Sequence, residues 1–186
     1  MRIVAIIPAR GGSKRLPKKN IFLLKGKPLI TYTIEACKRS KYINDVYVSS
    51  DDEEILNVSA KSGAIALKRP IELADDATPK MEAIRNAAKH PTLLSAGDPD
   101  IIIIPQANSP QLKAEDIDKG FEMLFKFNLW EVMSADENGV QNAAFRIIRA
   151  EHINNTFLSA HCGFVIVPCM DVHTIEDINE LEKKMG

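Results

Sequence analysis

The sequence of 186 residues lacks the features that mark several protein classes. Its three cysteines, Cys37, Cys162 and Cys169, form no CxxC pair, so we expect small buried thiols and neither a disulfide framework nor a structural zinc site. No run of 18 apolar residues is present, which excludes a membrane-spanning helix and predicts no membrane partner. The apolar stretch before Pro8 is too short for a signal-peptide core, so a cytoplasmic location is expected.

The chain has almost no net charge, with 24 Lys and Arg residues against 25 Asp and Glu residues. It therefore has no global field that would attract nucleic acid. Hydrophobic residues make up 45% and charged residues 26%, which excludes a disordered or collagen-like chain. The length favours a single domain, residues 1–186, with a sizeable buried core.

Acidic residues are missing from the first 34 positions, and Glu35 is the first one. The same segment holds eight basic residues: Arg2, Arg10, Lys14, Arg15, Lys18, Lys19, Lys25 and Lys27. This bias predicts an anionic ligand, although a solvated basic face would have the same composition. Phe22 and Tyr32 are the only aromatic rings there, so the pattern of base-stacking proteins is missing and no nucleic-acid partner is expected.

Apolar runs and helical periodicity alternate along the first 130 residues. The β-branched run 3–7 is typical of a strand buried on both faces, and the most apolar run, 100–106, is expected near the centre of a sheet. Further strands are expected at 45–50 and 64–67, and helices at 29–40, 53–62, 80–89 and 114–127. This order predicts a doubly wound, mostly parallel α/β sheet with its ligand at the carboxyl ends of the strands.

The C-terminal half predicts a β-hairpin followed by one more strand and a helix. The strands are expected at 129–135, 143–149 and 161–167, and the helix at 174–184. Asn138-Gly139 is a strong turn signal between the first two strands. Thr174 and Asp177 form a capping box, so Asp177 is expected to be structural. The acidic cluster 51–54 is likewise better explained by helix capping than by a metal site.

The segment from Pro8 to Asn20, PARGGSKRLPKKN, is the strongest site candidate. Gly11 and Gly12 allow a sharp turn, and successive N–H groups in such a turn form a concave nest for phosphate oxygens. Positive charge would surround this nest from Arg10, Lys14 and Lys19. The segment matches neither GxxxxGK[ST] nor GxGxxG, so it predicts a triphosphate site that is neither a Walker loop nor a dinucleotide fingerprint.

This segment and the blocks that follow it resemble the CMP-N-acylneuraminate synthetases, the cytidylyltransferases that activate sialic acids. The matching blocks fall in order between residues 3 and 76: IIPARGGSKRLPKKN, GKPLITYTIEA, VYVSSDDEEI and RPIELADD. A weaker match continues through PQANSPQ (105–111) and MDVHTIEDI (170–178). The resemblance implies a nucleotidyltransferase fold and a Mg²⁺-dependent transfer of CMP from CTP to the anomeric hydroxyl of a 2-keto-3-deoxy sugar acid, with release of pyrophosphate.

The resemblance also implies roles for single residues. CTP would be held by Ala9, Arg10, Gly11, Gly12, Ser13, Lys14, Lys19, Asn20 and Arg69, with the backbone of Ala9 lining the base pocket. The acceptor would meet Gln106, Asn108 and Ser109. Asp171 matches the first aspartate of the family's D-I-D metal motif and would hold Mg²⁺. Arg10, Lys14 and Asp171 are then the candidate catalytic residues.

Three of these residues have a structural alternative. Arg69, which precedes Pro70, could belong to a surface turn, and Gln106 could cap backbone groups at a strand end. Asp171 could cap the last helix or interact with its dipole. The sequence leaves these readings open.

The sequence departs from the family pattern at the metal and sugar ends. His173 replaces the second metal aspartate and suits Mg²⁺ poorly, and Leu112 stands where the family has an arginine. Lys80 lies near a position that usually carries a small hydroxyl residue. Arg146 and Arg149 could form a carboxylate clamp or could be exposed charges at a strand edge.

The segment between 128 and 163 is shorter than the family's dimerisation lobe, which leaves a reduced lobe at about 129–160. A homodimer through this lobe stays open. Because the triphosphate loop is intact, CTP binding is expected to survive better than turnover. Two alternatives therefore remain: the same fold acting on another sugar acceptor, and a catalytically degenerate CTP-binding module.

Overall fold

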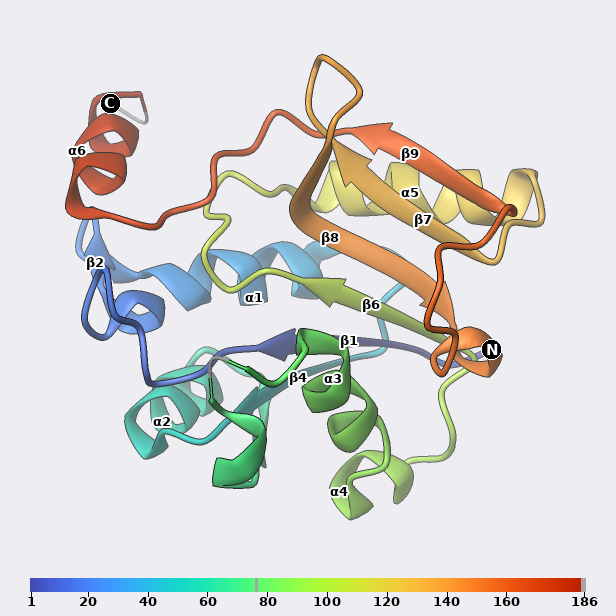
Figure 1. The fold of residues 1–186 in the computed structure, drawn as a ribbon, viewed down its shortest axis with the longest axis horizontal. Coiled ribbons are helices and arrows are strands. Elements are labelled where there is room, and N and C mark those ends of the chain that lie inside the picture. Colours follow the sequence, from blue (N-terminus) through green and yellow to red (C-terminus); the bar gives the residue numbers. More distant parts are fainter. Residues whose placement is uncertain (76, 185–186) are drawn as a thin grey trace.

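The computed structural model, which describes residues 1–75 and 77–184, contains one seven-stranded sheet (Figure 1). In spatial order its strands are β5 (Ile65–Lys68), β4 (Asp45–Ser50), β1 (Ile3–Pro8), β6 (Ile101–Pro105), β8 (Gln141–Arg149), β7 (Glu131–Ala135) and β9 (Cys162–Ile166). β8 runs antiparallel to both of its neighbours, and the other adjacent strands are parallel. The predicted mostly parallel sheet is confirmed, and the strand expected from the run 100–106 is β6, at its centre.

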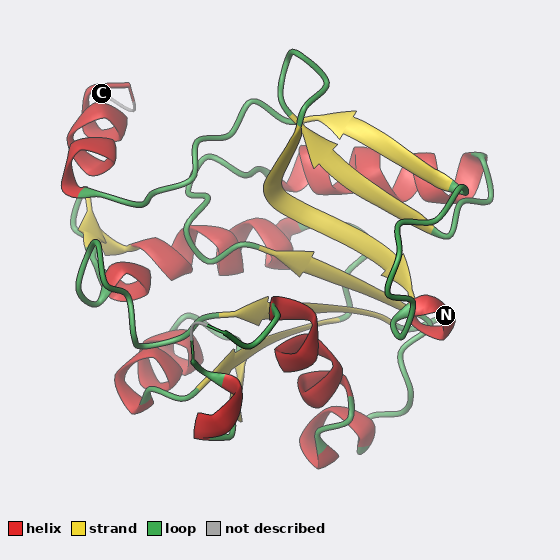
Figure 2. Cartoon of the chain, viewed as in Figure 1, coloured by secondary structure: helices red, strands yellow, loops and turns green. Residues whose placement is uncertain are grey.

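Helices cover both faces of this sheet (Figure 2). The longer helices are α1 (Leu29–Arg39), α2 (Glu53–Lys61), α3 (Lys80–Ala88), α5 (Ala114–Lys126) and α6 (Ile175–Lys184). Successive residues of β1 point to opposite faces of the sheet. On one face Ile3, Ala5 and Ile7 pack with α1, α2 and α5. On the other face Val4 and Ile6 pack with α3. This is the doubly wound arrangement that the sequence predicts. None of the helices in the described ranges is both long enough and apolar enough to span a membrane.

Several short elements were not predicted by periodicity. They are η1 (Lys19–Ile21), β2 (Leu23–Leu24), β3 (Lys27–Pro28), η2 (Ile71–Leu73), α4 (Pro91–Leu94) and η3 (Ala150–His152). The β2–β3 hairpin turns through Lys25 and Gly26, both with positive φ. Elements of two to four residues are too short to show an apolar period, which is why the sequence pattern misses them.

The predicted turn at Asn138-Gly139 joins β7 to β8. The Asp136 carboxylate accepts the N–H groups of Asn138 and Val140, both at 2.9 Å, and Gly139 has a φ of +77°. The resulting hairpin belongs to the central sheet, because β8 pairs with β6 on its other side. The expected C-terminal hairpin is therefore an extension of the main sheet, and its role in dimerisation stays a prediction.

The C-terminal segment returns to the first loop before it ends in α6. Val172 donates its N–H to the Asn108 carbonyl at 2.9 Å, which ties this segment to the loop after β6. α6 then packs through Ile178 and Leu181 on Leu16, Leu24 and Leu29. The capping box is confirmed, because the Asp177 carboxylate accepts the Thr174 N–H at 2.8 Å and the Thr174 hydroxyl accepts the Asp177 N–H at 3.4 Å. This route brings residues 171–173 close to the first loop.

Candidate functional site

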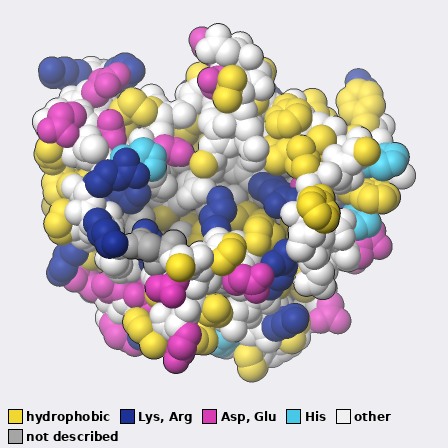
Figure 3. Space-filling view, in the orientation of Figure 1, with side chains coloured by type: hydrophobic (Ala, Val, Ile, Leu, Met, Phe, Trp, Pro, Cys, Tyr) yellow, Lys and Arg dark blue, Asp and Glu magenta, His cyan; other side chains and the backbone are white. Residues whose placement is uncertain are grey.

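A cavity of about 570 Å³ opens where the loops after β1, β5 and β6 meet (Figure 3). Its lining residues come from these loops, from the start of α3 and from the segment before α6: Pro8, Arg10, Ser13, Lys14, Arg15, Lys19, Asn20, Arg69, Leu73, Asp75, Thr78, Lys80, Ala83, Gln106, Ala107, Asn108 and His173. From β1 the chain continues to β4, and from the adjacent β6 it continues to β7 at the other side of the sheet, so the cavity lies where the strand order changes direction. A cavity therefore lies at the carboxyl ends of the strands, where the ligand is expected, and ligand binding there stays a prediction.

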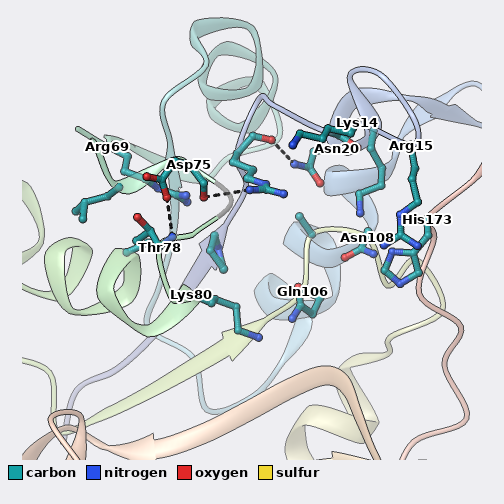
Figure 4. A pocket seen from close by; sticks show the side chains of 17 residues that line it. Lys14, Arg15, Asn20, Arg69, Asp75, Thr78, Lys80, Gln106, Asn108 and His173 are labelled. Atoms are coloured by element: carbon teal, nitrogen blue, oxygen red, sulfur yellow. Dashed lines mark hydrogen bonds between the residues drawn. The ribbon is translucent and has the colours of Figure 1, made fainter. Parts of the chain in front are cut away.

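Positive charge dominates the lining (Figure 4). Six basic side chains reach the cavity: Arg10, Lys14, Arg15 and Lys19 from the segment after β1, Arg69 from the loop after β5, and Lys80 from the start of α3. Among the described lining residues, Asp75 is the acidic one. Arg15 and Lys80 were not among the predicted site residues, although the run of basic residues without acids already included Arg15. Such a field suits a ligand with several negative charges, such as a nucleoside triphosphate.

Hydrogen bonds fix the first loop around the cavity. The Asn20 side-chain amide donates to the Arg10 carbonyl at 2.9 Å, and Asn20 is buried. Arg10 Nη1 donates to the Asp75 carbonyl at 3.1 Å, which joins this loop to the segment before α3. Ala9 is buried and donates its N–H to the Ser49 carbonyl at 3.0 Å, so its backbone anchors the loop to β4 rather than lining the cavity.

The glycine pair does not form the expected phosphate nest. Gly11 donates its N–H to the Asp51 carboxylate at 3.1 Å, and neither glycine has a positive φ. A Cβ built on Gly11 would lie 2.7 Å from Asp52 Oδ2, whereas one on Gly12 would meet nothing within 4 Å. Asp52 caps α2 as predicted, by accepting the N–H of Glu54 at 2.8 Å. Gly11 therefore serves close packing against the start of α2, and the cationic side chains remain as the anion-binding feature.

Arg69 is a buried cation in the wall of the cavity. Only 5% of its surface is exposed, which contradicts the surface-turn alternative. Its Nη2 donates to the Ser49 carbonyl at 2.5 Å and its Nε to the Ser49 hydroxyl at 3.2 Å. Burial lowers the pKa of Arg69, and the nearby Asp51 carboxylate opposes this shift. β4 and β5 therefore hold this guanidinium rigidly at the cavity.

The opposite wall holds polar groups that mostly bond to one another. The Asn108 amide nitrogen donates to the Val172 carbonyl at 2.8 Å, and the hydroxyl of the fully buried Ser109 donates to Asp171 Oδ1. Ser109 and Asp171 lie outside the cavity lining, so Ser109 is not placed where it could contact an acceptor sugar bound in the cavity. Gln106 faces the cavity, while its carbonyl accepts the Thr33 hydroxyl at 2.8 Å and its N–H donates to the Ala144 carbonyl at 3.1 Å.

Eight of the thirteen predicted site residues thus line one cavity: Arg10, Ser13, Lys14, Lys19, Asn20, Arg69, Gln106 and Asn108. The other five lie behind the lining or beside it: Ala9, Gly11, Gly12, Ser109 and Asp171. The last residue of the RPIELADD block, Asp76, lies outside the described residues.

Two lysines of the cavity have lowered pKa values. Burial, and then the positive charge of Arg15, lower the pKa of Lys19. Lys80 stays in contact with water inside the open cavity, but the surrounding protein atoms lower its pKa by desolvation, and Arg146 adds to this shift. The Asp171 carboxylate acts against the shift at both lysines. Asp171 therefore lies close enough to the lining to influence its charges.

The described residues include no group of three or more His, Cys, Asp and Glu side chains arranged to hold a metal ion. Asp171 is the one predicted ligand, and Ser109 already donates a hydrogen bond to its Oδ1. Mg²⁺ commonly binds one or two carboxylates, keeps several waters and takes its remaining ligands from substrate phosphates. Asp171 offers one carboxylate but lies beside the cavity lining rather than in it, so its role in holding Mg²⁺ together with triphosphate oxygens stays a prediction.

Arg146 and Arg149 do not form the suggested clamp. Arg146 donates through Nε to Glu131 Oε2 at 2.8 Å and borders a second cavity. Arg149 lies at the far end of β8, where it donates to the Leu129 carbonyl at 2.9 Å and to the Asn128 side chain at 3.0 Å. Their spacing of three residues along a strand points the two side chains to opposite faces of the sheet.

Comparison with known proteins identifies the fold and the family. The family model described as Cytidylyltransferase matches residues 4–155. The chain belongs to the cytidylyltransferase family. A solved structure of CMP:2-keto-3-deoxy-manno-octonic acid synthetase complexed with CTP superposes with a TM-score of 0.77 over 100% of this chain and 98% of that one, at 15% sequence identity. This likeness confirms the nucleotidyltransferase fold.

Two curated relatives support the resemblance to enzymes of sialic-acid type. Pseudaminic acid cytidylyltransferase of Campylobacter jejuni subsp. jejuni serotype O:23/36 is 49% identical over 88 residues, which are 47% of this chain and 38% of the relative. N-acylneuraminate cytidylyltransferase A of Danio rerio is 38% identical over 124 residues, 67% of this chain and 28% of the relative. In both cases the match spans well under half of the relative's length.

Proposed function

We propose that this cytidylyltransferase-family chain transfers CMP from CTP to the anomeric hydroxyl of a sialic-acid-like 2-keto-3-deoxy sugar acid and releases pyrophosphate. The single observation that carries the proposal is the cavity at the carboxyl ends of β1 and β6 with six basic side chains in its lining. The names of the two curated relatives, which refer to pseudaminic acid and N-acylneuraminate, favour an acidic sugar as acceptor.

In the proposed reaction the anomeric oxygen forms a bond to the α-phosphorus of CTP. The bond from this phosphorus to the oxygen that bridges the α- and β-phosphates breaks, the hydroxyl proton passes to solvent, and pyrophosphate leaves. The triphosphate would be neutralised by Arg10, Lys14, Arg15 and Lys19. Because Asn20 and Asp75 hold Arg10 in place before the ligand arrives, little reorganisation is needed during the reaction.

Mg²⁺ is part of the proposal. Asp171 would hold the ion together with phosphate oxygens of the nucleotide, and the bound ion would neutralise triphosphate charge and orient the leaving group. His173 lines the cavity two residues further on, but imidazole is a poor ligand for Mg²⁺, so it is not assigned to the metal.

Titration calorimetry with CTP and UTP, with and without Mg²⁺, combined with pyrophosphate release tests this function. The proposal expects tighter binding of CTP than of UTP, a gain in affinity with Mg²⁺, and pyrophosphate release with N-acetylneuraminate or another acid of its class. Protein that binds none of these nucleotides would contradict the proposal.

Binding of CTP with Mg²⁺ but no pyrophosphate release with any acid would favour the second candidate, a CTP-binding module without turnover. The replacement of the second metal aspartate by His173 is the observation that favours this candidate.

A further inference from the structure

The loop that carries most cations of the first cavity has an apolar anchor at Leu16. Lys14 and Arg15 directly precede this leucine, and Lys19 follows it and donates its N–H to the Leu16 carbonyl at 3.1 Å. The three basic side chains line the cavity, whereas Leu16 lies outside the lining and is only 5% exposed. The position of Leu16 therefore constrains the backbone from which these cations project.

Leu16 is buried in a cluster that is separate from the two layers of the main core. Its members come from the first loop, the β2–β3 hairpin, the start of α1 and the C-terminal segment, and we term them the C-terminal cluster: Leu16, Leu24, Leu29, Val172, Ile178 and Leu181. Three of the six residues follow position 171. The anchor of the first loop therefore depends on side chains from the opposite end of the described chain.

α6 docks on the protein through this cluster. Of its ten described residues, Ile178 and Leu181 are the buried ones, and both belong to the C-terminal cluster. Figure 1 shows the helix beside β2 and apart from the central sheet, and the Glu182 carboxylate accepts the Lys25 N–H at 3.3 Å. A helix of this length is marginal in water by itself, so its docking on the loop and the hairpin keeps it folded.

The segment that leads into α6 also reaches the cavity. Val172, a member of the C-terminal cluster, donates its N–H to the Asn108 carbonyl at 2.9 Å and accepts the Asn108 amide at 2.8 Å. The next residue, His173, lines the cavity. No residue of α6 belongs to the part of the lining that the structure describes. The helix is therefore connected to two sides of the cavity while it lies outside it.

We propose that α6 is a positioning element for the triphosphate: its docking on Leu16 holds Lys14, Arg15 and Lys19 at the cavity, and a bound triphosphate in turn stabilises the docked helix. This inference rests on the function proposed above, in which these cations neutralise the triphosphate. Leu16 and Leu181 are then positioning residues that act through the cations and contact no ligand.

The proposal implies a coupling between docking and binding. A molecule with α6 undocked has lost the support of Leu16, and its apparent Kd for a triphosphate increases as the docked fraction decreases. Because such a coupling is reciprocal, a triphosphate that binds the docked form more tightly also reduces the opening of α6.

The experiment compares CTP with CMP, which lacks the two terminal phosphates. Both are titrated by calorimetry with EDTA in place of Mg²⁺, so that no metal ties Asp171 to the nucleotide. We expect the wild-type protein to bind CTP about tenfold or more tightly than CMP, since only CTP offers the terminal phosphates to the cations. Leu16→Ala and Leu181→Ala should each reduce this preference about fivefold or more. Leu181→Met should keep it, because methionine fills a similar volume.

Leu93→Ala is the matched control. Leu93 is a fully buried leucine of α4 that packs in the layer beneath α3, so its truncation also leaves a cavity in an apolar cluster. This variant should lower Tm but change the preference for CTP less than about twofold, because it does not touch the first loop. A merely structural role of the C-terminal cluster would make Leu16→Ala and Leu181→Ala behave like this control.

Hydrogen exchange of the wild-type protein tests the coupling without any variant. CTP in EDTA should slow amide exchange in residues 175–184 as well as in the loop 10–20, while α4 exchanges at an unchanged rate. Slower exchange in the loop alone would overturn the role of α6.

The outcomes separate this inference from the proposed function. A preference for CTP that depends on Leu16 and Leu181, without pyrophosphate release with any acid when Mg²⁺ is restored, would support the role of α6 and contradict the proposed function. Turnover with a preference that survives in both alanine variants would overturn the role of α6 alone. A wild-type protein that binds CTP and CMP equally also overturns this role, and one that binds neither nucleotide overturns both proposals.

Discussion

The loop from Arg10 to Asn20 forms one wall of the first cavity, and residues 106–108 with His173 line another, which residues 109 and 171–172 support from behind. In the first, which we term the basic wall, backbone hydrogen bonds fix the loop while cationic side chains face the cavity. In the second, termed the amide wall, the polar side chains of Asn108 and Ser109 bond to the segment before α6. The basic wall therefore turns several charged side chains toward the cavity, whereas much of the amide wall holds two distant segments together.

Removing a cation from the basic wall should have the largest effect. Lys14→Ala should lower kcat/KM for CTP about 100-fold, because the lysine lines the cavity and would neutralise charge that develops on the departing pyrophosphate. Steady-state pyrophosphate release measures the effect. Lys18→Ala is the matched control: Lys18 is exposed, lies outside the lining and pairs with Glu54. Near-normal activity of Lys14→Ala would refute the role of the basic wall.

Two substitutions in the amide wall should have different effects, one on the free energy of unfolding and the other on turnover. Ser109→Ala should reduce the free energy of unfolding by about 1–3 kcal/mol, because it leaves Asp171 Oδ1 without its buried donor. Asp171→Asn retains an oxygen that can accept the Ser109 hydroxyl, so its stability should stay near that of the wild type, while Mg²⁺-dependent turnover falls about tenfold or more. Urea unfolding and pyrophosphate release measure both. An Asp171→Asn protein that loses stability but keeps full specific activity would make Asp171 purely structural.

The two glycines of the basic wall provide a comparison within one loop. Gly11→Ala should reduce the free energy of unfolding by about 1–3 kcal/mol, because the new Cβ would come within 2.8 Å of the Asp52 Cβ. Gly12→Ala should change it by less than about 0.5 kcal/mol, since that side chain would enter open space. Thermal unfolding of both variants tests the difference. If the two variants were equally stable and only Gly11→Ala lost CTP binding, the predicted phosphate nest would be supported and the packing role of Gly11 contradicted.

Local patterns predicted the features that depend on neighbouring residues. The buried run at 3–7, the turn at Asn138-Gly139 and the capping box at Thr174 follow from short-range sequence signals, and all three are confirmed. The position of the cavity followed from the strand order. In contrast, Gly11 meets Asp51 across 40 positions, and Ser109 meets Asp171 across 62. Contacts of that separation leave no periodic signal in a single sequence, so the loss of the nest and the burial of Ser109 became visible only in three dimensions.

The smallest expected effect is a pH dependence that arises in the basic wall. Burial and Arg15 hold the pKa of Lys19 below its ordinary value of 10.5, so this lysine loses its proton at a lower pH than an exposed lysine does. A triphosphate beside Lys19 favours the charged form and raises the pKa again. CTP binding should therefore take up protons, and its affinity should fall as the pH rises through the lowered pKa.

Calorimetry at about pH 9 in two buffers of different ionisation enthalpy measures the number of protons taken up. Lys19→Gln should reduce that number, and Lys80→Gln should reduce it further, because the pKa of Lys80 is lowered as well. Lys18→Gln should leave it unchanged, since Glu54 raises the pKa of Lys18 and keeps its proton in place. The lowered pKa of Lys19 also affects folding. The folded state binds fewer protons at Lys19 than the unfolded chain does, so the contribution of this group to the free energy of unfolding increases as the pH rises toward 10.5. Binding heats that are identical in both buffers would show that Lys19 does not face the triphosphate.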